Sequence, residues 1–139
     1  MAEASATKDV EASAEAAWAV VGDFTTLHRW AVGMASLELT KGDGEALGSV
    51  RAVTMENGGG KVVEELLAKE AMAYRYAILE APLPLEHYVG EVRVEPTRFG
   101  ARISWRSRFD VGNGASEQEL CAMLEQMYAA SLESAAAKL

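Results

Sequence analysis

The segment 100–110, GARISWRSRFD, constrains the fold more than any other part of the chain, because its side chains alternate strictly in character. Small or apolar residues alternate with basic or hydroxyl residues: Ala101, Ile103, Trp105, Ser107 and Phe109 with Arg102, Ser104, Arg106 and Arg108. An alternation of period two predicts a β-strand with one dry face and one solvated face. Such a strand belongs in an antiparallel sheet whose dry face is covered by a second layer.

Four further segments carry β-branched or aromatic residues at period two and predict strands: 48–56, 61–69, 72–80 and 86–95. Clusters of Gly, Pro and polar residues separate them at the spacing of successive antiparallel strands. The run Gly-Gly-Gly-Lys at 58–61 lacks the spacing of a phosphate-binding loop, so it predicts a hairpin. With a short strand near the N-terminus, the pattern predicts a curved antiparallel sheet of about seven strands.

Helix signals occur at the two ends of the chain. Ser116 and Glu119 have the spacing of a capping box. Apolar residues then recur at helical spacing: Leu120, Met123, Leu124, Met127, Tyr128 and Leu132. We therefore expect a helix over 117–138, about 33 Å long at 1.5 Å per residue. Near the N-terminus, Ser13 predicts the start of a short helix that ends at Gly22, and a second short helix is expected over 26–32.

The composition bounds the class of protein. The chain has 139 residues, of which 50% are hydrophobic and 24% charged, so 1–139 is expected to form one globular domain. Strands grouped apart from helices indicate the α+β class, with the long helix packed on the concave face of the sheet. The net charge of −8 repels phosphate backbones and anionic lipid surfaces, so nucleic acid is not an expected partner.

The sequence also predicts where the protein resides. Its longest apolar run, 16–22, is far shorter than the roughly 18 residues that begin to suggest a membrane span, so no membrane insertion is expected. The first residues do not resemble a signal peptide. The single cysteine, Cys121, allows no internal disulfide, which is the usual situation in a reducing compartment. We therefore expect a cytoplasmic protein.

Arg51 and Glu65 are the most informative polar residues. Each alternates with apolar residues two positions away, which predicts that both point toward the interior of the sheet. Isolated charges there are costly, and pairing is the usual remedy. We therefore expect an Arg51–Glu65 pair that binds a ligand carbonyl or carboxylate, or orients an acid/base step. A bulge or a register shift of one residue would place one of them outside, and the sequence leaves this alternative open.

Several aromatic residues fall on the predicted inner faces: Tyr74, Tyr76, Tyr88 and Trp105. Each combines an apolar ring with a polar tip, which is the lining expected of a pocket for a ring-bearing ligand. Ordinary core packing is the more frequent role of aromatics at strand spacing, so it stands as the alternative for each residue.

The chain has two histidines, His28 and His87, and neither lies in a recognised metal-ligand spacing, so no metal site and no cofactor are predicted. Imidazole has a suitable pKa for acid/base work. His28, near the expected mouth of the interior, is the better candidate, although a histidine on the surface or rim is the simpler interpretation. The catalytic candidates are His28, Arg51 and Glu65.

Several short segments together resemble a known superfamily: VEASAEAAW at 10–18, GDF at 22–24, LHRW at 27–30, GSVR at 48–51, EELL at 64–67, YRYAI at 74–78, PLP at 82–84, and Trp105 with Phe109. The chain is similar over nearly its whole length to the START-like, or SRPBCC, superfamily, and most of all to its bacterial polyketide cyclase/dehydrase branch. The resemblance implies the helix-grip fold, with a sheet wrapped around the long C-terminal helix and a cavity between them. It also implies that this cavity holds an apolar or amphipathic small molecule such as a polyketide, sterol or lipid.

Three functions remain open at this stage. The first is cofactor-free binding of a small apolar or aromatic molecule, in a pocket walled by Trp30, Arg51, Glu65, Tyr74, Tyr76, Tyr88, Trp105, Met123 and Met127. The second is an enzyme of the cyclase/dehydrase type, in which positioned acids and bases close and dehydrate a poly-β-keto chain. The third is a subunit that forms a homodimer through its long helix or a sheet edge, with a vestigial cavity.

Overall fold

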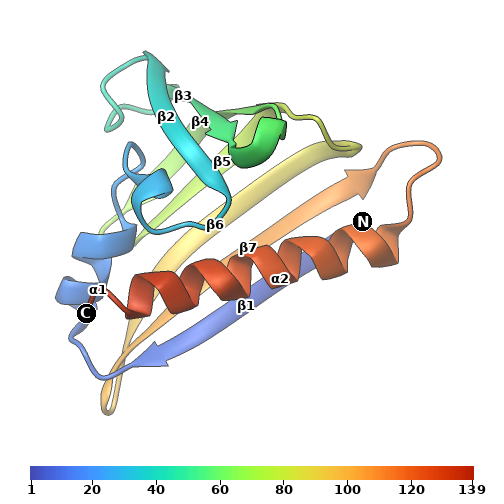
Figure 1. The fold of residues 1–139 in the computed structure, drawn as a ribbon. Helices are drawn as coiled ribbons and strands as arrows, with labels where there is room; N and C mark the ends of the chain where they lie inside the picture. The colour runs from blue at the N-terminus through green and yellow to red at the C-terminus, as the bar shows by residue number, and fades with distance from the viewer.

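The computed structural model describes residues 1–139, which form one seven-stranded sheet with a long helix across its inner face (Figure 1). Its elements are β1 (Ala2–Val10), α1 (Ala14–Val21), the 3-10 turn η1 (Leu27–Arg29), β2 (Met34–Lys41), β3 (Val50–Met55), η2 (Glu56–Gly58), β4 (Lys61–Glu70), β5 (Ala73–Glu80), β6 (Leu85–Thr97), β7 (Gly100–Val111) and α2 (Glu117–Ala136). Every neighbouring pair of strands is antiparallel, in the order β1-β7-β6-β5-β4-β3-β2. The predicted α+β helix-grip architecture is confirmed.

Capping side chains fix where the two helices begin. Ser116 Oγ accepts a hydrogen bond from the Glu119 N–H, and Ser13 Oγ accepts one from the Ala16 N–H, as the sequence predicts. The prediction of a second short helix over 26–32 is wrong in its extent, because only the 3-10 turn η1 forms there. Gly33 follows with φ of 78°, a backbone conformation that favours glycine and turns the chain into β2.

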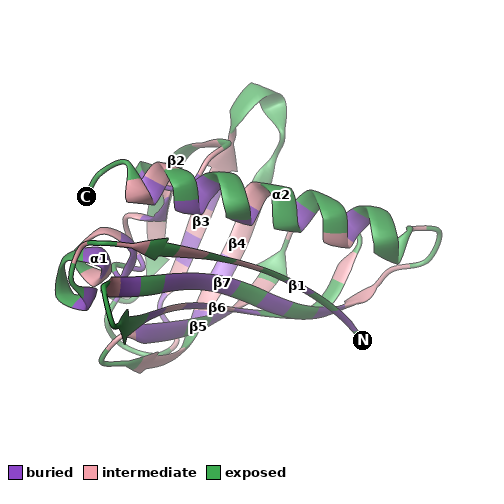
Figure 2. Cartoon of the chain, turned by 90° about the horizontal axis from the view of Figure 1, so that it is seen from below, coloured by how far each residue is buried: buried purple, intermediate pink, exposed green.

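The inner face of the sheet and one stripe of α2 form the core. The alternation in β7 behaves as predicted, with its odd positions buried and its arginines outside. On α2 the buried stripe recurs mainly every fourth residue, with exposed residues on the side that faces away from the sheet (Figure 2): Leu120, Leu124, Tyr128, Ser131, Leu132 and Ala135. The prediction that Met123 lines the interior is wrong, because it lies at the edge of this stripe with 42% of its surface exposed. Met127 is half-buried against the core.

Helix α2 also runs along the free edge of β1 (Figure 1). The Ser5 N–H, which points away from β7, donates to Glu125 Oε2 at 3.0 Å. Lys8 pairs with Glu133 at 2.8 Å. The first contact occupies a backbone N–H that an exposed edge strand would otherwise offer to another chain, and the second ties the β1 and α2 side chains together. No helix of the structure is both long and apolar enough to cross a membrane.

Candidate ligand site on the inner face of the sheet

A buried ion pair joins β3 to β4 on the inner face. Arg51 and Glu64 lie directly opposite each other, and the Arg51 Nε and Nη2 atoms are both 2.7 Å from Glu64 Oε1. Arg51 points inward, as the alternation predicts, and is fully buried. The predicted pairing with Glu65 is wrong, because Glu64 and Leu66 face the interior and Glu65 lies on the outer face between them.

The sequence of β4 explains this error. Residues 62–67 read VVEELL, so each residue type occurs twice in succession. A strand placed in either phase therefore presents the same Val-Glu-Leu pattern to the interior, and hydrophobicity does not choose between them. The choice comes from the register with β3, which sets Glu64 rather than Glu65 opposite Arg51.

Aromatic rings enclose the guanidinium of Arg51. Its Cζ lies 4.1 Å from the centre of the Phe24 ring and 5.1 Å from that of Tyr76. Its Nη1 donates to the Phe24 carbonyl at 2.7 Å and to the Tyr74 hydroxyl at 3.3 Å. Burial by itself lowers the pKa of Arg51, but Tyr74 and Glu64 outweigh it, so the pKa is raised and the guanidinium stays charged. Burial raises the pKa of Glu64, although Arg51 opposes this.

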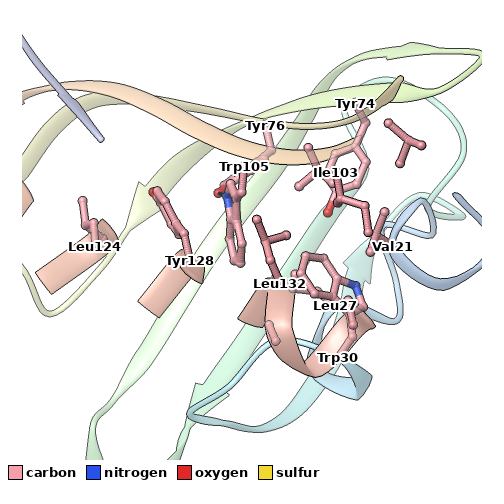
Figure 3. Packing of buried hydrophobic residues seen from close by; sticks show 14 of the residues in the cluster. Val21, Leu27, Trp30, Tyr74, Tyr76, Ile103, Trp105, Leu124, Tyr128 and Leu132 are labelled. Carbon is pink, nitrogen blue, oxygen red and sulfur yellow. Dashed lines mark hydrogen bonds between the residues drawn. The ribbon is translucent and has the colours of Figure 1, made fainter. Parts of the chain in front are cut away.

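A chain of hydrogen bonds crosses the interior beside this pair, and three of its members, Tyr76, Trp105 and Tyr128, are labelled in Figure 3. The Tyr128 hydroxyl of α2 donates to Ser107 Oγ at 2.8 Å and lies 2.5 Å from the Tyr88 hydroxyl. Tyr88 in turn lies 2.8 Å from Tyr76, which accepts from the Trp105 Nε1–H at 2.8 Å. Because each phenol has one proton, the order of donation runs from Trp105 through Tyr76, Tyr88 and Tyr128 to Ser107.

Burial keeps these phenols neutral. It is the largest cause of a pKa well above the ordinary value for Tyr76 and Tyr88, and it raises the pKa of Tyr128 to about 12. Burial also raises the pKa of Tyr74, against the opposing effect of Arg51. At neutral pH the interior thus offers hydroxyl groups and one compensated ion pair, without free negative charge.

Three buried polar atoms in this region have no hydrogen-bond partner: His28 Nδ1, Trp30 Nε1 and Arg51 Nη2. Arg51 Nη2 nevertheless lies 2.7 Å from Glu64 Oε1 and is ion-paired with it, so only His28 Nδ1 and Trp30 Nε1 are left without a partner. The Trp30 side chain is 1% exposed and tilts against Trp105, with ring centres 5.4 Å apart. Unpaired buried donors are costly, so they identify atoms that a bound molecule could satisfy.

The described side chains fill much of the space where the sequence predicts a cavity. Trp105 stacks on Tyr128 with ring centres 4.4 Å apart and planes inclined by 21°. Two hollows, of about 820 and 610 Å³, lie on the outer face of the sheet.

The other site residues predicted from sequence fall as follows. His28 lies half-buried on η1, whereas His87 is exposed, with its Nδ1 3.0 Å from Asp110 Oδ2. No group of three or more His, Cys, Asp or Glu side chains is arranged to hold a metal ion. The sequence did not identify Glu64 as the partner of Arg51, and it did not predict that Tyr128 and Ser107 would be hydrogen-bonded through their hydroxyls. The position of Ser107 on the apolar face of its strand was the one signal in the sequence for this polar contact.

Fold and site together define a class: an α+β helix-grip domain with a polar-lined aromatic interior beneath its C-terminal helix. The chain belongs to the family described as "Polyketide cyclase / dehydrase and lipid transport", whose model matches residues 1–139. No curated protein matches the sequence.

Solved structures with low sequence identity share the fold. The protein XoxI from Bacillus cereus is 23% identical, with a TM-score of 0.89 over 99% of this chain and 95% of that chain. A protein from Thermobifida fusca is also 23% identical, with a TM-score of 0.87 over 98% and 91%. The di-domain ARO/CYC StfQ from the steffimycin biosynthetic pathway is 14% identical, with a TM-score of 0.78 over 97% of this chain and 49% of that chain.

Proposed function

We propose that this protein binds a small aromatic or apolar molecule between the inner face of the sheet and α2. The observation that carries the proposal is the set of polar atoms in this interior, because an all-apolar core would stabilise the fold at lower cost. The unpartnered Trp30 Nε1 borders the Tyr76–Trp105 pair, because the Trp30 ring packs against Trp105, and the ion-paired guanidinium of Arg51 contacts the Tyr76 ring. A ligand that carries a hydrogen-bond acceptor would satisfy the Trp30 donor.

The family description supports this proposal, since it includes lipid transport beside cyclase and dehydrase activity. The proposed ligand stacks on the interior aromatics and places an acceptor atom at Trp30 or Arg51. Of the residues first suggested by sequence, Trp30, Arg51, Tyr74, Tyr76, Tyr88, Trp105 and Met127 are kept in the proposed site, and Glu64 takes the place of Glu65.

One observation favours cyclase/dehydrase chemistry as a second candidate. Both contacts of the ion pair fall on Glu64 Oε1, so Glu64 Oε2 receives no hydrogen bond and lies beside a charged guanidinium. A donor and an acceptor side by side could polarise a carbonyl and take up a proton. His28, with its unpartnered Nδ1, is the remaining candidate for proton transfer. A pH–rate profile on a model polyketide tests this function; no turnover above buffer at any pH would leave binding as the function.

Native mass spectrometry of freshly purified protein, followed by denaturing extraction, tests the binding proposal. We expect a stoichiometric small-molecule adduct, and extraction then gives its chemical class. The same protein, stripped of adduct, is titrated with the neutral fluorescent probe N-phenyl-1-naphthylamine, which brightens in apolar surroundings. A protein that carries no adduct and gives no saturable increase in probe fluorescence would contradict the proposal.

A matched pair of variants locates the site. The double variant Arg51→Met/Glu64→Leu removes the buried polar pair while keeping apolar volume, and we expect it to weaken binding of an acceptor-bearing ligand. The control, Arg106→Ser, removes an exposed arginine on the opposite face of the sheet and should leave the affinity unchanged.

A further inference from the structure

The outer face of the sheet concentrates the positive charge of an acidic protein. Five of the eight arginines lie on this face of β5, β6 and β7, and we call them the outer arginines: Arg75, Arg93, Arg102, Arg106 and Arg108. Each stands between inward-facing neighbours, so all five are on the side opposite the candidate ligand site. Four carboxylates, Glu3, Asp9, Glu91 and Glu95, lie on the same face, so the five arginines outnumber them by one, whereas the chain as a whole has a net charge of −8.

A groove runs along this face. Its larger part, about 820 Å³, is lined by four of the outer arginines and by only two glutamates, Glu3 and Glu91, so its formal charge is positive. Its smaller part, about 610 Å³, has no net formal charge, because Lys8, Arg102 and Arg106 are balanced there by Asp9, Glu95 and Glu133. Arg106 borders both parts and therefore lies at the centre of the groove.

Arg106 differs from its four neighbours in having no carboxylate within 4 Å. Arg75 pairs with Glu91 at 3.0 Å, and Arg108 pairs with Glu3 at 2.8 Å. Arg93 and Arg102 also have carboxylate partners. In the register of the sheet, Arg106 lies opposite Ser5 and Glu91, and the latter already accepts hydrogen bonds from Arg75 and Arg93. The Arg106 guanidinium thus retains its full capacity to bind a carboxylate in the two-pronged manner typical of arginine.

We propose that the groove on the outer face docks an acidic polypeptide segment of a partner protein, with Arg106 as the group that receives a carboxylate. Exposed ion pairs are weak, so carboxylates of the partner can replace those of Glu3 and Glu91 at little cost. The exposed side chain of Val89 in the groove adds a short apolar contact. The net charge of −8 opposes both a long polyphosphate and a second copy of the same chain, whereas a short acidic segment meets mainly the arginines.

An NMR titration of the ¹⁵N-labelled protein with a short, acetylated and amidated oligoglutamate peptide tests this proposal at low ionic strength. We expect saturable shifts of backbone amides in β1, β7, β6 and β5, and weaker binding as salt is added. Arg106→Glu should reduce the affinity by about tenfold or more, as expected when one charge-assisted contact is lost. The matched control is Arg98→Glu, which changes an exposed arginine in the β6–β7 turn, outside the groove.

Several results would overturn the proposal. One is the absence of shifts at a large excess of peptide; another is an equal loss of affinity in the two variants, which would mean non-specific attraction. Stronger shifts of the same amides with duplex DNA would assign the groove to nucleic acid. A rise in mass by light scattering that Arg106→Glu abolishes would assign it to a second copy. Thermal melting of Arg106→Glu, compared with wild type, shows whether a loss of binding reflects unfolding.

Discussion

The two faces of the sheet each contain a cross-strand arginine–glutamate pair, and the two pairs have nearly the same geometry. Arg51 lies opposite Glu64 on the inner face, and Arg108 lies opposite Glu3 on the outer face. The nitrogen–oxygen distances are 2.7 and 2.8 Å. The side-chain exposures, however, are 0% and 8% for the inner pair against 71% and 63% for the outer one. Breaking the buried pair should therefore change the free energy of unfolding far more than breaking the exposed pair.

The difference in burial indicates which of the two pairs is costly for the fold to keep. An exposed pair costs little to form and little to lose, which suits a surface that exchanges partners. A buried pair requires two charges to leave water, and apolar residues of the same volume would often be at least as stable. The presence of Arg51 and Glu64 in the interior therefore supports the proposal that they take part in binding a small molecule.

The largest expected effect comes from breaking the inner pair. Glu64→Gln leaves the Arg51 charge buried without a counter-charge, so the free energy of unfolding should fall by about 3–5 kcal/mol. The matched change on the outer face, Glu3→Gln, should cost less than about 1 kcal/mol, because Arg108 remains solvated. Urea denaturation at neutral pH measures both values. Equal losses in the two variants would contradict the comparison.

Removing both members of the inner pair sharpens the comparison. In Arg51→Met/Glu64→Leu no buried charge is left, but the Phe24 carbonyl loses its donor, so the free energy of unfolding should stay within about 1–3 kcal/mol of wild type. The same urea denaturation applies, with the single variant Glu64→Gln as reference. A double variant as unstable as the single one would show that the pair is needed for folding.

A smaller effect is expected for the hydroxyl chain. Tyr128→Phe removes the group that links Tyr88 to Ser107 and leaves their polar atoms buried without that partner, which should cost about 1–3 kcal/mol. Thr40→Val removes an exposed hydroxyl on β2 and should change the stability by less than about 0.5 kcal/mol. Thermal or urea unfolding distinguishes the two. An unchanged stability for Tyr128→Phe would mean that water replaces the lost contacts.

The smallest expected effect on stability near neutral pH comes from the ionisation of the tyrosines, which becomes important only in alkaline solution. All four tyrosines are buried, and burial raises the pKa of each above the ordinary value, to about 12 for Tyr128. The folded state therefore retains phenolic protons that the unfolded chain loses near pH 10. Stability from this source is complete below pH 10 and declines as the pH rises toward 12 and beyond. Phenolate absorbance of the folded protein at pH 10, compared with that in denaturant, checks this; half-ionised tyrosines in the folded state would contradict it.

The sequence predicts the fold well, because alternation and helical spacing report directly on what is buried. The five segments expected as strands all form strands, and Ser13 and Ser116 cap the helices as predicted. The N-terminal strand is longer than expected, and β2 was not delimited, since its residues Met34–Lys41 are largely exposed or half-buried and show little apolar contrast.

The candidate site was predictable only in part. Arg51 alternates with Val53 and Met55, which predicts its inward direction, although the sequence alone leaves a shift of one residue open. The repeated VVEELL pattern hides the phase of β4, and only pairing with β3 selects Glu64. The chain of hydroxyls depends on which strands lie side by side and on the rotation of α2, and neither quantity is encoded in local spacing.

The indole N–H signals of the three tryptophans test the central claim most directly, because each reports on one known place. Trp30 and Trp105 lie in the candidate ligand site, whereas Trp18 lies on α1 and contacts Tyr74 at 6.4 Å between ring centres. In a titration of ¹⁵N-labelled protein with N-phenyl-1-naphthylamine, or with the ligand recovered by extraction, we predict saturable shifts of the Trp30 and Trp105 signals that exceed that of Trp18. Unmoved Trp30 and Trp105 signals at saturating ligand would contradict a binding site on the inner face.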